Sequence, residues 1–121
     1  MLVGALGAMG LASAAQAQGT PAMYGLIGRM RAKPGQRDAL IAILLDGVSG
    51  MPGCLSYIVA QDPKDADAIW ITEVWDTAAS HRASLSLPSV QAAIAKGRPL
   101  IAGMDAGTET VVVGGHGLVK S

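Results

Sequence analysis

The sequence contains no phenylalanine, only two tryptophans and two tyrosines, and a single cysteine, Cys54. One cysteine cannot form an intramolecular disulfide, so no covalent cross-link supports the fold, and we expect Cys54 to pack as a small buried side chain. Half of the 121 residues are nevertheless hydrophobic. The sequence therefore predicts one domain with an aliphatic core of Leu, Ile, Val, Met and Ala.

The chain also lacks an excess of either charge, since nine Lys and Arg residues balance nine Asp and Glu residues. No basic patch is present to follow a phosphate backbone, which argues against nucleic acid as a partner. The two histidines, His81 and His116, are far apart in the sequence and have no nearby cysteine or carboxylate cluster. We therefore predict no metal site and, without a dinucleotide-binding glycine motif, no nucleotide cofactor.

The first 17 residues carry no charge and are rich in Ala, Gly, Leu and Met. They end in Ala15-Gln16-Ala17, the small-x-small pattern of a signal-peptidase site. We interpret residues 1–17 as a signal peptide, which predicts a periplasmic or secreted protein; if it is a mere extension, the protein is cytoplasmic. The segment is too short and too rich in glycine and alanine for a stable membrane anchor. The folded domain is expected at 22–114, followed by a flexible tail at 115–121.

Hydrophobic periodicity predicts the order β-α-β-β-α-(α)-β. This order is typical of the ferredoxin-like split βαβ fold, an α+β fold whose helices cover one face of an antiparallel sheet. The other face would stay uncovered, which predicts a homodimer with Val111 and Val113 near the interface. The expected strands are 23–31, 54–61, 68–75 and 108–113, and the expected helices are 36–49, one from a cap at Asp76 or Thr77 to about 87, and 89–96.

The junction between the strand at 68–75 and the next helix carries the most suggestive side chains. Glu73 and Trp75 are two residues apart and therefore face the same side of the sheet. On the following helix Ala78, His81 and Leu85 share one face, so His81 points towards the sheet. A carboxylate, an indole and an imidazole at one junction predict a pocket.

We take His81 and Trp75 as candidate catalytic residues and Glu73, Tyr57 and Leu85 as candidate substrate contacts. A purely structural alternative stays open. In that alternative Trp75 is core, Glu73 pairs with an arginine, and His81 is an ordinary half-buried helix residue.

Five segments together resemble the antibiotic biosynthesis monooxygenase family over residues 23–113. The resemblance implies a dimeric α+β barrel with a pocket between each sheet and its helices. Some members oxidise quinols or polycyclic phenols with dioxygen, without metal or flavin, and others degrade haem. The segments that carry the resemblance are Met23-Tyr24-Gly25-Leu26-Ile27-Gly28, Lys33-Pro34-Gly35-Gln36-Arg37, Pro52-Gly53-Cys54-Leu55-Ser56-Tyr57, Glu73-Val74-Trp75-Asp76 and Leu87-Pro88-Ser89-Val90.

The sequence departs from the haem-degrading members, which require an asparagine late in the first strand and a tryptophan and a histidine on the later helices. Gly28, Ser84 and Ile94 stand at these positions, which disfavours haem degradation. Quinol-oxidising members often have a histidine where this chain has Ser84. Here His81 lies one helical turn earlier, whereas Trp75 matches the family's tryptophan.

The sequence thus predicts a cofactor-independent monooxygenase that oxidises a quinol or phenolic small molecule with dioxygen. An imidazole can take the proton of a phenol near neutral pH, and an aromatic wall can stack on the resulting ring. Two alternatives use the same fold: a non-catalytic small-molecule binding or stress protein, and an isomerase or decarboxylase.

We predict that the mature chain begins at Gln18, because signal peptidase prefers small side chains at the two positions occupied by Ala15 and Ala17. Intact-mass spectrometry of the protein from its native host measures this directly. Retention of Met1 in a cytosolic fraction would contradict the prediction.

Overall fold

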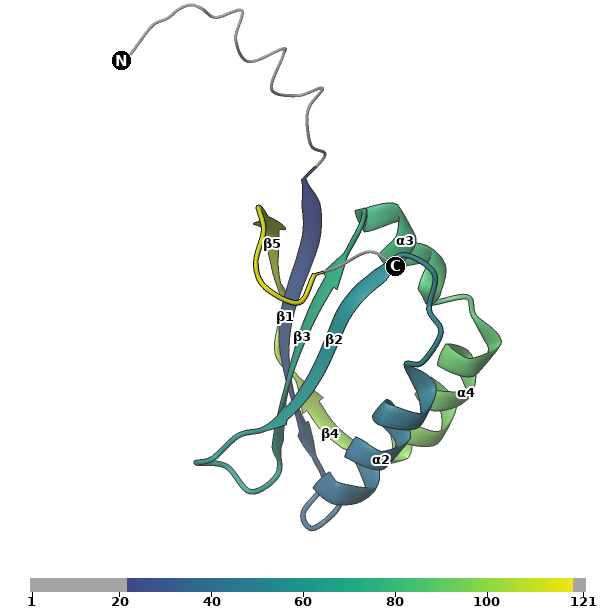
Figure 1. The fold of residues 1–121 in the computed structure, drawn as a ribbon. Coiled ribbons are helices and arrows are strands. Elements are labelled where there is room, and N and C mark those ends of the chain that lie inside the picture. Colours follow the sequence, from purple (N-terminus) through teal and green to yellow (C-terminus); the bar gives the residue numbers. More distant parts are fainter. Residues whose placement is uncertain (1–21, 119–121) are drawn as a thin grey trace, which may run out of the picture.

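The computed structural model describes residues 22–118 (Figure 1). The expected signal peptide and the last three residues of the expected tail lie outside this range. No helix of the described residues is long and apolar enough to cross a membrane. The elements in chain order are β1 (Met23–Ala32), α2 (Arg37–Gly47), β2 (Cys54–Gln61), β3 (Ala68–Trp75), α3 (Ala78–Ser84), α4 (Pro88–Gly97), the 3-10 turn η1 (Arg98–Leu100), β4 (Ile101–Met104) and β5 (Thr108–Val112).

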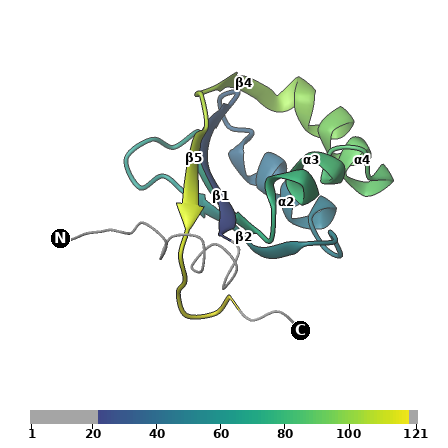
Figure 2. The same ribbon diagram turned by 90° about the horizontal axis from the view of Figure 1, so that it is seen from above.

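The strands form one antiparallel sheet in the order β2-β3-β1-β4, and β5 also pairs with β1. All three helices lie on one side of this sheet, as the view from above shows (Figure 2). The α+β, ferredoxin-like prediction is therefore confirmed. β2 and β3 have the predicted bounds, because apolar and polar side chains alternate within both strands and turn residues mark their ends.

The prediction of four strands is wrong, because residues 101–104 form a strand instead of a link. β4 pairs with the end of β1 at Met30–Ala32, and β5 pairs with its beginning at Met23–Ile27. Two short strands thus share one edge of β1, separated by residues 105–107. The sequence hides β4 because Ile-Ala-Gly-Met is short, lacks alternation and contains residues that are poor strand formers.

The helix after β3 is shorter than predicted and does not reach residue 87. Thr77 caps it, with the Thr77 side chain accepting a hydrogen bond from the Ser80 amide at 3.0 Å. Leu87 is extended because it precedes Pro88, which begins α4 as the first helical residue. The chain therefore forms two helices, α3 and α4, between β3 and β4.

The core lies between the sheet and the helices and, apart from Trp75, is aliphatic as predicted. Alternate residues of β1 and β3 face α2 and α4, which pack side by side. The opposite face of the sheet is uncovered and leaves three large side chains exposed: Ile27, Ile58 and Trp70. The fully packed cluster consists of Met30, Ala32, Leu40, Ile69 and Ile71.

One end of the uncovered face is charged. Arg29 lies 3.2–3.4 Å from carboxylate oxygens of Asp62, Asp65 and Asp105, and Arg31 lies 3.0 Å from Asp65. The acidic loop between β2 and β3 is thereby tied to β1. The apolar part of the uncovered face therefore lies outside this charged end.

Two leucines of α2 offer a matched test of this core. Leu40 is 1% exposed and Leu45 is 54% exposed. We expect Leu40→Ala to lower the free energy of unfolding by about 2–5 kcal/mol, whereas Leu45→Ala should change it by less than about 0.5 kcal/mol. Urea denaturation of both variants measures the difference. Equal effects would contradict the placement of α2 on the sheet.

Candidate active site

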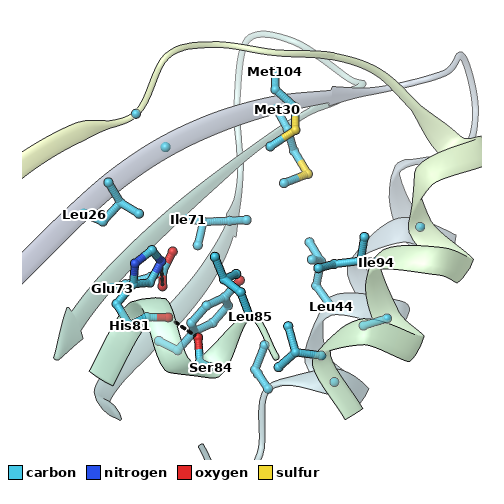
Figure 3. A pocket seen from close by; sticks show the side chains of 18 of the residues that line it. Leu26, Met30, Leu44, Ile71, Glu73, His81, Ser84, Leu85, Ile94 and Met104 are labelled. Carbon is cyan, nitrogen blue, oxygen red and sulfur yellow. Dashed lines mark hydrogen bonds and ion pairs between the residues drawn. The ribbon is translucent and has the colours of Figure 1, made fainter. Parts of the chain in front are cut away.

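A cavity of about 790 Å³ lies between the sheet and the three helices. Its volume falls in the range of small-molecule sites. Strands β1 and β3 form its floor, and α2, α3 and α4 form its roof (Figure 3). Most of the lining is aliphatic, and the labelled apolar residues are Leu26, Met30, Leu44, Ile71, Leu85, Ile94 and Met104.

Glu73, Trp75 and His81 meet at one end of this cavity. The Trp75 indole nitrogen donates a hydrogen bond to Glu73 Oε1 at 2.9 Å. His81 Nε2 lies 3.8 Å from the same oxygen. One carboxylate oxygen therefore faces both the indole and the imidazole. The three side chains converge at this junction, as the sequence predicted.

Burial dominates the electrostatics of Glu73. Desolvation raises the pKa of the Glu73 carboxyl above its ordinary value of 4.5, while the Trp75 hydrogen bond and the nearby His81 act in the opposite direction. A carboxyl whose pKa is raised in a cavity can hold or release a proton closer to neutral pH than an exposed one.

His81 is also held by two aromatic rings. Its ring centroid lies 5.4 Å from that of Tyr24 at an interplanar angle of 31°, and 5.5 Å from that of Trp75 at 70°. The Tyr24 hydroxyl donates a hydrogen bond to Glu109 at 2.7 Å, which ties β1 to β5 beside the site. Sequence reasoning missed Tyr24 as a site residue. The only available signal was its position on the same face of β1 as Leu26 and Met30.

The structure brings the other two candidates to the same cavity. Tyr57 lies opposite Glu73 on the neighbouring strand, and burial raises the pKa of its hydroxyl. Leu85 follows α3 and lines the cavity while remaining partly open to solvent. The catalytic and substrate-binding roles of all five candidates remain predictions.

The structural alternative for this junction is partly wrong. Glu73 does not pair with an arginine, since its partners are Trp75 and His81. Trp75, however, is only 1% exposed and is a core residue as well as part of the cavity wall.

The three positions at which the resemblance predicts a departure from haem-degrading members all line the cavity: Gly28, Ser84 and Ile94. The buried Ser84 hydroxyl donates a hydrogen bond to the His81 carbonyl oxygen at 2.6 Å. None of the three side chains carries a nitrogen that could ligate iron. Within residues 22–118, no group of three or more His, Cys, Asp or Glu side chains is arranged to hold a metal ion.

The raised pKa of Glu73 predicts a pH-dependent effect of Glu73→Gln on stability. The folded state keeps this proton at pH values at which the unfolded chain has lost it. The carboxyl is therefore neutral in both states below pH 4.5, and it destabilises the folded state as pH rises through its folded pKa. We expect the melting temperature of Glu73→Gln to rise relative to that of the parent as the pH increases from about 4 to about 7.

The control is Asp46→Asn, which removes an exposed carboxylate on α2 that does not line this cavity. Differential scanning calorimetry of the three proteins across this pH range measures the effect. If the parent instead gains stability over Glu73→Gln as pH rises, Glu73 is held as an anion by its partners.

Comparison with known proteins identifies the family of this chain. The family model described as antibiotic biosynthesis monooxygenase matches residues 23–96. A structure from Chloroflexus aurantiacus, assigned as an antibiotic biosynthesis monooxygenase, is 77% identical with a TM-score of 0.78, covering 80% of this chain and 99% of that one. None of the curated proteins with which the chain was compared matches it.

More distant structures share the fold alone. One from Caulobacter crescentus, also assigned as an antibiotic biosynthesis monooxygenase, is 18% identical with a TM-score of 0.71, covering 77% of this chain and 92% of that one. A protein from Pseudomonas aeruginosa is 20% identical with a TM-score of 0.69, covering 78% and 98%. The extent of the family match and the 77% identity are decisive: the chain belongs to the antibiotic biosynthesis monooxygenase family.

Proposed function

We propose that this protein oxidises a quinol or phenolic small molecule with dioxygen, using neither metal nor flavin. One observation carries the proposal: His81 stands next to the Glu73 carboxylate in a cavity whose lining is mostly aliphatic. A mostly apolar cavity suits a flat aromatic ligand. The imidazole is placed to take a proton from a hydroxyl group on that ligand.

The proposed reaction begins with proton transfer from a ligand hydroxyl to His81. The resulting phenolate is electron-rich and passes one electron to dioxygen. The two radicals combine, which forms a carbon–oxygen bond at a ring carbon that carries hydrogen. That carbon then gives its proton to the terminal oxygen as the oxygen–oxygen bond breaks, and the hydroxide that leaves takes the proton held by His81. A phenol and dioxygen thus give a quinone and water, with all atoms and electrons balanced.

The neighbouring side chains have distinct roles in this proposal. Glu73 stabilises the protonated imidazole in a partly dehydrated site, where a charge pair is stronger than in water. Trp75 closes the end of the cavity beside His81 and holds Glu73 through its indole nitrogen. Because Trp75 is almost fully buried, we expect it to contact the ligand by an edge. Tyr57 and Leu85 would cover the ligand ring.

A second candidate is an isomerase or decarboxylase that moves protons without oxygen. The raised pKa of Glu73 favours it, because a carboxyl and an imidazole that share one site can act as an acid and a base. A non-catalytic binding or stress protein would use the same cavity without this proton transfer.

We also propose that the protein acts as a homodimer through its uncovered sheet face. Three large side chains are exposed there: Ile27, Ile58 and Trp70. The register pairs Val111 with Tyr24, so Val111 belongs to the helix side and not to the uncovered face. Val111 and Val113 remain exposed at the β5 edge, where a partner could also bury them. The proposed periplasmic or extracellular location rests on the sequence of residues 1–17.

We expect His81→Ala to lower turnover by about 10²–10⁴-fold, because a positioned general base contributes this much. Oxygen uptake with menadiol as the substrate measures the effect, and His116→Ala, at an exposed histidine, is the matched control. If His81→Ala is as fast as the parent, the base assignment is wrong. If the parent consumes no oxygen with any quinol, the proton-transfer or binding alternatives take precedence.

The dimer has a matched test in two equally exposed aliphatic residues. Ile58 on the uncovered sheet face is 55% exposed, and Leu45 on α2 is 54% exposed. We expect the parent and Leu45→Asp to sediment at twice the chain mass at micromolar concentration. Ile58→Asp should sediment as a monomer, because the interface would have to bury an unpaired charge. A monomeric parent would refute the dimer.

A further inference from the structure

Gly28 occupies the middle of β1 and faces the cavity. It pairs with Ile71 across β3, and residues directly opposite in a sheet share one face. Leu26 and Met30, two residues away on either side, face the same way and also line the cavity. The cavity floor therefore consists of two long side chains with a bare stretch of backbone between them.

Packing does not explain a glycine at this position. A Cβ atom built on Gly28 would meet no heavy atom within 4 Å, and Gly28 has no positive φ. Gly25 on the same strand differs, because a Cβ there would collide with the Thr110 hydroxyl. Glycine inside a strand weakens it, so a glycine that no neighbour requires calls for another reason.

The neighbouring edge of the sheet is interrupted beside Gly28. On that side Met30 pairs with Met104 of β4, and Ile27 pairs with Thr108 of β5. Gly28 lies opposite the break at 105–107 and has no paired residue there. Gly28 thus lines the cavity floor with no side chain and no paired residue on the β4–β5 side. Figure 3 shows the two ends of this floor, Glu73 at one end and Met30 and Met104 at the other.

We propose that Gly28 is a specificity-determining residue, whose missing side chain lets the second ring of a fused-ring ligand lie against the strand. The choice of an aromatic ligand rests on the proposed function. A ligand with its hydroxyl at His81 extends along the floor towards Met30, and so passes over Gly28. Side-chain atoms at position 28 would occupy the space that this second ring needs, while a single ring at His81 would be less affected.

The test compares Gly28→Ala and Gly28→Val with Gly103→Val. Gly103 is also a strand glycine whose added Cβ would meet nothing within 4 Å, but it pairs with Arg31 and does not line the cavity. The probes are duroquinone, with one ring, and 2,3-dimethyl-1,4-naphthoquinone, with two. Both are fully substituted on the quinone ring, so they resist addition of the Cys54 thiol. Equilibrium dialysis measures the binding, and thermal melting confirms that each variant is folded.

We expect the dissociation constant of the two-ring probe to rise by about tenfold or more for Gly28→Val and by a smaller factor for Gly28→Ala. Groups that fill part of a binding pocket typically have effects of this size. The one-ring probe should be affected less, and Gly103→Val should bind both probes like the parent. If Gly28→Val does not fold, the Gly28→Ala result decides.

The inference is overturned if the parent binds the two-ring probe no more tightly than the Gly28 variants, or if Gly103→Val weakens it equally. Oxygen uptake is measured separately with menadiol, because the quinol of the two-ring probe has no hydrogen-bearing carbon on its quinol ring at which the proposed oxygenation could occur. A parent that binds the two-ring quinone but consumes no oxygen would refute the proposed oxidation and still support the role of Gly28.

Discussion

The register between β1 and β3 is the constraint on which the site depends. It places Tyr24 opposite Trp75, Leu26 opposite Glu73 and Gly28 opposite Ile71, all on the side of the sheet that carries the helices. Because side chains alternate along a strand, a slip of one residue would move this whole set to the uncovered face. The aliphatic residues of the two strands prevent such a slip, since Met30 and Ile69 are buried only in this register.

In this arrangement Glu73 lowers the stability of the folded state, because a buried carboxylate loses its hydration. Its compensation is local. The Trp75 indole donates to it from two residues along the same strand face, and His81 approaches from the helix that follows directly. The strand–helix junction thus assembles its polar group from a segment of nine residues, Glu73 to His81, and needs the rest of the fold mainly to enclose it.

This locality explains how much of the site could be predicted from the sequence. The facing of Glu73 and Trp75 follows from strand periodicity, and the inward direction of His81 follows from helix periodicity, so all three were predicted. Tyr24 was missed because its contact with His81 depends on how α3 is placed over the sheet, which no local pattern encodes. The sequence could not identify the partner of Glu73 for the same reason.

The fold shows the same division. β2 and β3 were predicted with their observed bounds because turn residues and alternation mark both ends. β4 was missed because Ile101 to Met104 carries no alternating pattern and becomes a strand only by pairing with the end of β1. α3 ends at Ser84, and the next three amide groups donate to carbonyl oxygens three residues earlier, as in a turn, before Pro88 begins α4.

The alternation of β1 has a consequence for how this protein can diversify. Ile27 and Gly28 are neighbours in the chain, yet one side chain position belongs to the uncovered face and the other to the cavity. A substitution at Ile27 can change what the outer face meets without altering the cavity, and a substitution at Gly28 can do the reverse. Substitutions in this one strand can therefore change the outer face and the cavity independently during evolution.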